Sequence, residues 1–172
     1  MTKDSRKFGI GDKRGRSRSS EDPYLAEEGL KDPSLCRICG AVYHNKRWTF
    51  DPETYARLEA SGEANWVTCP ACRKKAEGYA EGVVVLRGDY LWEHEDEIYN
   101  LLKNEEARAM DKNPLERIIR MARENGDLVI ETTEEKLAEH FGRALHKAHQ
   151  GDLRVSWSDD HDVCRVFWER TV

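Results

Sequence analysis

The chain has 172 residues, of which 38% are hydrophobic and 35% are charged, so it has room for one or two small domains with modest cores. No apolar run approaches the ~20 residues that a membrane-spanning helix needs, and we expect no membrane association. No hydrophobic segment of the kind that a secretory signal requires follows the first residues, Met1 to Asp4. These features predict a cytoplasmic protein.

The charges are distributed unevenly along the chain. The net charge is −5, but residues 1–20 hold seven basic and two acidic side chains, a local charge of +5 that leaves −10 for the remainder. Residues 1–33 contain few apolar side chains and are predicted to form a disordered basic arm. Segment 11–18 is similar to arginine-rich stretches that contact RNA, which makes Arg14, Arg16 and Arg18 candidate phosphate contacts. The alternative is a tail that only keeps the protein soluble.

Four of the five cysteines stand in two close pairs, Cys36 with Cys39 and Cys69 with Cys72. Two residues between paired thiols allow one turn to present both sulfur atoms to a tetrahedral ion, and Zn²⁺ accepts four thiolates. Four protein ligands leave no open coordination position, so one structural Zn²⁺ is predicted. Two disulfides or a redox-active pair are the alternatives, and both fit a cytoplasmic chain with duplicated motifs less well. His44 is an alternative fourth ligand.

Residues 34–80 are predicted to form this zinc module, with a treble- or ribbon-like fold. The two pairs are separated by 29 residues, more than the usual spacing of about 15–20, so a substructure is expected between them. Asp51 and Pro52 predict the start of a helix that ends near Ala60, before Ser61-Gly62.

The zinc module also carries candidate nucleic-acid contacts. Its aromatic residues belong either to a small core around the metal or to a surface on which bases stack: Tyr43, Trp48 and Trp66. A compact basic patch follows the second cysteine pair and is a predicted phosphate contact: Arg73, Lys74 and Lys75.

Residues 81–172 are predicted to form a small α+β domain. A short β run at 83–86 precedes a helical pattern over 90–110. A second helix is predicted over 113–124, opened by an Asn-Pro pair and closed by Asn-Gly. Its three arginines lie outside the apolar stripe and are expected to face solvent: Arg117, Arg120 and Arg123.

The last part of the chain has the pattern β-α-β-β. A strand is predicted at 127–131, followed by a helix that a Thr132–Glu135 capping box opens and Gly151 ends. Residues 153–157 and 163–168 alternate with period two and predict a hairpin. Three strands can then cover one amphipathic helix.

Little else in the sequence suggests chemistry. The predicted hairpin loop contains Asp159, Asp160, His161 and Asp162, and such a loop either binds a hard cation or is a solvated turn. Cys164 lies in an apolar run and is predicted to be a buried core residue rather than a nucleophile. No nucleotide-binding loop, nucleophile elbow or HExxH pattern is present, so a non-enzymatic protein is predicted.

The two cysteine pairs, the 83–87 run and the C-terminal segment together resemble a small bacterial zinc-ribbon family (BCAM-type). The cysteine pairs and the residues after them are also distantly similar to the N-terminal zinc region of the nonsense-mediated-decay-three family, adaptors of the large ribosomal subunit. The resemblance implies that Cys36, Cys39, Cys69 and Cys72 bind zinc, and it implies association with RNA or the ribosome. The chain is far shorter than those adaptors and has no room for their later domains.

The sequence therefore predicts a zinc-binding, non-enzymatic protein that contacts RNA or a ribosomal particle. A protein–protein adaptor in transcription or stress response, with the same structural zinc, is the alternative.

Overall fold

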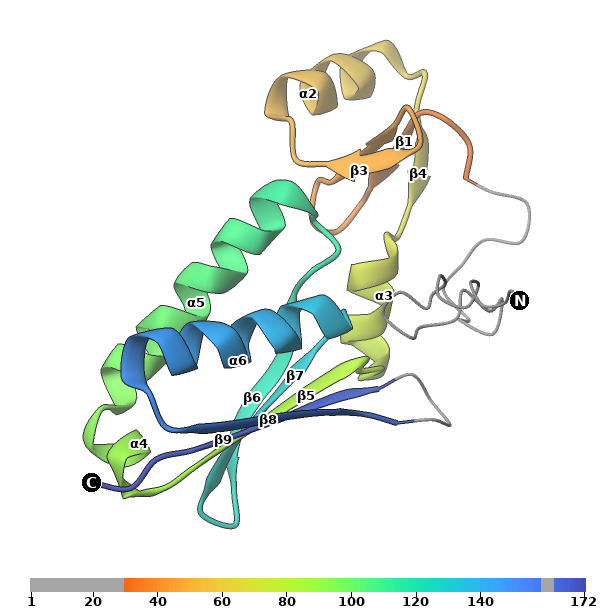
Figure 1. The fold of residues 1–172 in the computed structure, drawn as a ribbon. Coiled ribbons are helices and arrows are strands. Elements are labelled where there is room, and N and C mark those ends of the chain that lie inside the picture. Colours follow the sequence, from red (N-terminus) through yellow and green to blue (C-terminus); the bar gives the residue numbers. More distant parts are fainter. Residues whose placement is uncertain (1–29, 159–162) are drawn as a thin grey trace, which may run out of the picture.

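A computed structural model describes residues 30–158 and 163–172, and it has an α+β fold with two mixed sheets (Figure 1). The predicted arm residues Arg14, Arg16 and Arg18 lie outside the described residues. The predicted acidic loop, Asp159 to Asp162, also lies outside them.

The first sheet contains the strands that surround the cysteines. Its order is β3-β2-β1-β4. The strands are β1 (Ser34–Cys36), β2 (Val42–His44), β3 (Arg47–Thr49) and β4 (Asn65–Val67), of which β1, β2 and β3 are antiparallel and β4 is parallel to β1. Helix α2 (Pro52–Ser61) connects β3 to β4, and α3 (Pro70–Glu77) follows β4.

The prediction for α2 is confirmed. The Asp51 side chain accepts a hydrogen bond from the backbone N–H of Thr54, and Pro52 occupies the first helical position. The helix ends at Gly62, whose φ of 73° is in the left-handed region that favours glycine. Local capping chemistry was therefore sufficient to place both ends.

The second sheet has five strands in the order β6-β7-β5-β9-β8. They are β5 (Gly82–Arg87), β6 (Ile118–Glu124), β7 (Asp127–Thr132), β8 (Asp152–Trp157) and β9 (Cys164–Glu169). Helices α4 (Asp89–Glu93) and α5 (Glu95–Lys112) connect β5 to β6, and α6 (Glu135–His149) connects β7 to β8. Because β7 lies between β5 and β6, the first connection is a split β-α-β unit. The predicted β-α-β-β order from β7 onward is confirmed.

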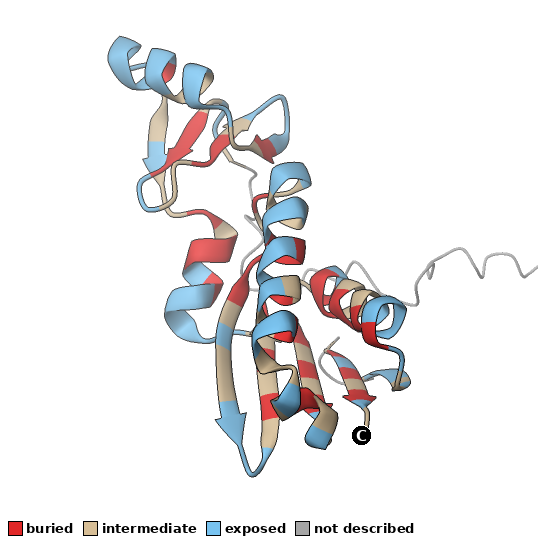
Figure 2. Ribbon diagram, turned by 90° about the vertical axis from the view of Figure 1, so that its left-hand side faces the viewer, coloured by how far each residue is buried: buried red, intermediate tan, exposed pale blue. Residues whose placement is uncertain are grey.

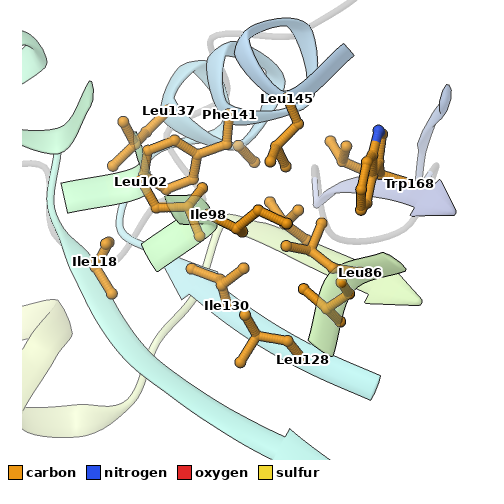
Figure 3. Close-up of a cluster of buried hydrophobic side chains, with 14 of the residues drawn as sticks. Leu86, Ile98, Leu102, Ile118, Leu128, Ile130, Leu137, Phe141, Leu145 and Trp168 are labelled. Carbon is orange, nitrogen blue, oxygen red and sulfur yellow. The ribbon is translucent and has the colours of Figure 1, made fainter. Parts of the chain in front are cut away.

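Helices α5 and α6 cover one face of this sheet (Figure 1). Alternate residues of β5 point into the core, since Val84 and Leu86 are fully buried while Val83 and Val85 are partly exposed. Figure 2 shows this alternation along the strands and the mostly exposed surface of α2. The core side chains converge between the sheet and the two helices in Figure 3, with Phe141 among them. Cys164 is fully buried in this core, as predicted.

The helix predicted over 113–124 is wrong. Residues 118–124 form strand β6, which pairs with β7 in antiparallel register. Asn125 and Gly126 have φ values of 52° and 86°, as expected for a two-residue hairpin turn rather than a helix end. Asn113 accepts a hydrogen bond from the backbone N–H of Leu115 and so stabilises a local turn instead of a helix start.

Two other helix boundaries differ from the prediction. The helical pattern over 90–110 is interrupted at His94, which separates α4 from α5. Thr132 is the last residue of β7 rather than a helix cap, and its hydroxyl donates to the carbonyl oxygen of Glu134. Helix α6 begins one residue after Glu134 with no side-chain cap.

Candidate metal centre

Two local structures deliver the four cysteines. Cys36 ends β1, and the turn that follows contains Cys39 and then Gly40, whose φ is 83°. The second pair opens α3: Cys69 is its N-cap, Pro70 is the first helical residue, and Cys72 lies in the first turn. A turn and a helix start thus present two sulfur atoms each, which is the treble-clef form of the module predicted from the spacing.

The sulfur atoms are spaced as a tetrahedral ion requires. The Sγ atoms of Cys36 and Cys72 are 3.9 Å apart, those of Cys39 and Cys69 are 3.8 Å apart, and all four lie within 4.8 Å of one another. Four zinc–sulfur bonds of about 2.3 Å separate the sulfur atoms by about 3.8 Å. A disulfide needs a sulfur–sulfur distance of about 2.05 Å, and all four cysteines are free. The four-cysteine set therefore fits a metal ion and does not fit two disulfides.

Backbone N–H groups point at the sulfur atoms. Cys36 Sγ accepts from the N–H groups of Ile38 at 3.5 Å and Cys69 at 3.3 Å, and Cys69 Sγ accepts from that of Cys72 at 3.4 Å. The second and third donors lie at the N-terminus of α3, where the helix dipole favours negative charge. These groups stabilise thiolates, which are the metal-binding form.

Without a metal the four thiols cannot all ionise. Hydrogen bonds from Cys39 and then Cys69 lower the pKa of Cys36. Burial and the charge of Cys39 raise the pKa of Cys72, and hydrogen bonding to Cys36 and Cys39 raises that of Cys69. A metal ion must therefore displace protons when it binds, which makes its affinity depend on pH.

A buried arginine, missed by the sequence prediction, contacts the sulfur cluster. Arg117 is only 5% exposed. Its Nη2 atom lies 3.1 Å from Cys39 Sγ and 4.0 Å from Cys69 Sγ. Its Nη1 atom lies 3.8 Å from Cys72 Sγ. The guanidinium also lies over the ring of Phe50. The expectation that Arg117 faces solvent is wrong because the helix on which it was placed does not form.

The predicted basic patch is divided by the structure. Arg73 and Lys75 are exposed, as phosphate contacts must be. Lys74 is 2% exposed, and its ammonium group donates to Glu81 at 2.8 Å, Glu134 at 2.9 Å and the carbonyl oxygen of Thr133 at 3.1 Å. Lys74 is therefore not available to phosphate, and its prediction as an RNA contact is wrong.

The aromatic residues of the module also separate into two groups. Trp48 is buried and packs beside Tyr43 in the core that contains the cysteines. Trp66 is 45% exposed, with Tyr55 edge-on to its ring. Ile38, on the cysteine turn, is 64% exposed, and the Arg37 guanidinium next to it donates to the carbonyl oxygen of Trp66. The first pair forms the mini-core, and the second group forms a surface.

The histidines of the part that the structure describes do not join the cluster. His44 pairs with Asp32 at 2.7 Å and is not a ligand. His140 pairs with Glu105. His146 hydrogen-bonds to the carbonyl oxygen of Gly151, and His149 hydrogen-bonds to the hydroxyl of Tyr90. Among the described residues, the four cysteines are the only group of three or more potential ligands close enough to hold a metal ion.

The chain matches no family model, no curated protein and no solved structure. Within the described part of the chain, no helix combines the length and apolar character needed to cross a bilayer.

Proposed function

We propose that this chain is a non-enzymatic cytoplasmic protein that holds one structural Zn²⁺ and associates with RNA or a ribosomal particle. The spacing of the four sulfur atoms, close to the edge of a zinc–thiolate tetrahedron, carries the zinc assignment. Zn²⁺ is favoured over other ions because it takes four thiolates without a geometric or redox demand. Four thiolates occupy every position, so the centre holds the fold and activates no water.

RNA association is supported by where the basic and aromatic groups lie. The arm carries a local charge of +5 on an otherwise acidic chain, and the exposed Arg73 and Lys75 follow the metal ligands directly. Beside the cysteine turn, Arg37 and the exposed ring of Trp66 place a cation next to a surface on which a base can stack. Phosphate contacts at the arm and stacking at the module suit a single-stranded RNA.

The zinc assignment is tested by metal analysis of protein purified without chelators. We expect close to one zinc per chain, and loss of the metal in Cys69→Ser. Iron–sulfur absorbance, or a chain without metal, would contradict the assignment.

RNA association is tested by fluorescence anisotropy with a labelled single-stranded RNA, and by co-sedimentation with ribosomal subunits. If three to five basic groups contact phosphate, the slope of log K against log salt is about −2 to −3.5. Removing residues 1–20 should flatten this slope, and Arg73→Ser with Lys75→Ser should weaken binding further. Lys136→Ser with Lys147→Ser, two exposed lysines of α6, is the matched control.

A protein–protein adaptor is the second candidate, supported by the same exposed Ile38 and Trp66. It replaces the first if the full chain binds neither RNA nor ribosomal subunits at low salt.

A further inference from the structure

The metal module and the α+β domain contact each other through two buried cations, one from each side. Lys74 of α3 reaches from the module to Glu81 and Glu134 and to the backbone of Thr133. Arg117 reaches in the opposite direction, from the segment before β6 to the sulfur atoms. Figure 1 shows α3 between the two sheets, where these contacts form.

The domain holds Arg117 firmly at its backbone and at the base of its guanidinium. The backbone N–H of Arg117 donates to Thr133 Oγ1 at 2.8 Å, and the N–H of Thr133 donates to the carbonyl oxygen of Arg117 at 2.9 Å. The Nε atom donates to the carbonyl oxygen of Pro114 at 2.5 Å. Contacts from outside the module therefore fix the backbone and the Nε atom of Arg117, and the ring of Phe50 from the module lies against the guanidinium.

A metal ion binds the two segments that carry the sulfur atoms to one point, beside Arg117. Four thiolates around Zn²⁺ carry a net charge of −2, so an ionised guanidinium at hydrogen-bond distance is attracted strongly in a buried site. Without the metal, the turn that carries Cys39 and the helix start that carries Cys69 and Cys72 are no longer bound to one ion, so the sulfur atoms that the Nη atoms contact lose their fixed positions. Burying a cation without an anionic partner held beside it is unfavourable, so the metal-free state favours separation of the two surfaces.

From these contacts, and building on the zinc centre proposed above, we propose that Arg117 couples metal binding to docking of the two parts. Metal in the cluster holds Arg117 and with it Leu115, which packs against the cysteine core. Docking of the domain in turn raises metal affinity, because coupling between two equilibria is reciprocal. Arg117 is thus a positioning residue of the metal centre that comes from outside the metal module.

Zinc transfer to the chelating dye 4-(2-pyridylazo)resorcinol measures one side of this coupling in the full chain. Arg117→Met removes the charge but keeps the apolar part of the side chain, Arg117→Lys keeps the charge without the fork, and Arg143→Met removes an exposed arginine of α6 as control. Loss of an outer-shell contact typically lowers metal affinity about 10–100-fold. We expect a loss in this range for Arg117→Met, a smaller loss for Arg117→Lys and none for Arg143→Met.

Amide hydrogen exchange measures the other side of the coupling without any substitution. Residues 113–117 hold no metal ligand, yet removal of zinc from the wild-type chain should reduce their protection at least tenfold. The protection of strand β9, which lies on the side of β5 away from β7, should not change. In Arg117→Met the protection of 113–117 should be nearly the same with and without zinc.

The outcomes separate the coupling from the zinc centre itself. A wild-type chain that binds no zinc overturns both proposals. If the wild-type chain binds zinc, two results would overturn only the coupling. One is that removal of zinc leaves the protection of residues 113–117 unchanged, and the other is that Arg117→Met transfers zinc at the wild-type rate.

Discussion

Replacing Lys74 with Met should destabilise the folded protein by several kcal/mol, although the substitution lies in a run of basic residues that looks like a surface. The ammonium group of Lys74 is buried and makes three hydrogen bonds, two of them to carboxylates. Burial alone would lower the pKa of Lys74, but Glu134 and Glu81 outweigh burial and raise it, so the side chain stays charged at neutral pH. Met keeps the apolar stem and removes only the charge.

The size of this loss of stability depends on the two carboxylates that lose their cation. Removing one partner of a buried ion pair typically costs about 3–5 kcal/mol, because the other charge is left buried without compensation. The carboxylate side chains are 16% exposed in Glu81 and 24% exposed in Glu134, so water recovers part of the loss. We therefore expect about 3 kcal/mol, near the lower end of that range. With a urea dependence of about 2 kcal/mol per M, the unfolding midpoint falls by about 1.5 M.

Urea unfolding of the zinc-loaded chain, followed by circular dichroism, measures this loss. Lys75→Met is the matched control, since Lys75 is the exposed neighbour on the same helix, and it should change stability by less than about 0.5 kcal/mol. A difference between the two variants smaller than about 1 kcal/mol would refute the reasoning that Lys74 compensates buried acids.

The pH dependence gives an independent check on the same ion pair. Burial already raises the pKa of Glu134 against the opposing charge of Lys74. In Lys74→Met that opposing charge is absent, so the pKa of Glu134 rises further and, in a window above about pH 4.5, the folded state holds a proton that the unfolded state releases. Stability then rises as the pH falls through this window. The gap between Lys74→Met and wild type should therefore narrow from pH 7 to pH 5, whereas a loss that came only from packing would stay constant.

Two further predictions concern the domain core. Burial raises the pKa of Cys164 to about 12, so iodoacetamide at pH 8 should alkylate this thiol at least about 100-fold more slowly in the native chain than in urea. Because the folded state retains a proton that the unfolded state loses above about pH 8.5, wild-type stability should fall with pH relative to Cys164→Ala by about 1.4 kcal/mol per unit; parallel curves would contradict this. A Cβ at Gly142 in α6 would lie 2.7 Å from Val166 Cγ1 and 2.9 Å from Leu153 Cδ1. Gly142→Ala should lower the melting temperature, since overpacking of about 1–3 kcal/mol exceeds the gain of about 1 kcal/mol in helix propensity, and a rise would show that the helix shifts freely.

Features that depend on neighbours in sequence were predictable. The two-residue spacing of each cysteine pair identified all four members of the sulfur cluster, and Asp51, Pro52 and Gly62 set both ends of α2. Period-two alternation located the strands β8 and β9, and it placed Cys164 in the core. In each case the deciding interaction spans a few residues, or depends on which side of one element is apolar.

The segment 113–124 shows where that local information ended. Its apolar residues fit a helical stripe, and the Asn-Pro and Asn-Gly pairs at its ends fit helix boundaries as well as they fit turns. The antiparallel ladder with β7 decides the outcome. The Asn-Gly pair between two short runs was the one local signal that favoured a hairpin.

The roles of the two buried cations were decided only by the tertiary structure. Lys74 lies between exposed basic neighbours and meets Glu134, 60 residues away, while Arg117 meets Cys39, 78 residues away. The sequence around a charged side chain does not show whether that side chain is hydrated or pairs with an anion far away in the chain. The packing of α3 against the second sheet removes water from both groups. The run of charged residues in the sequence had suggested an exposed surface instead.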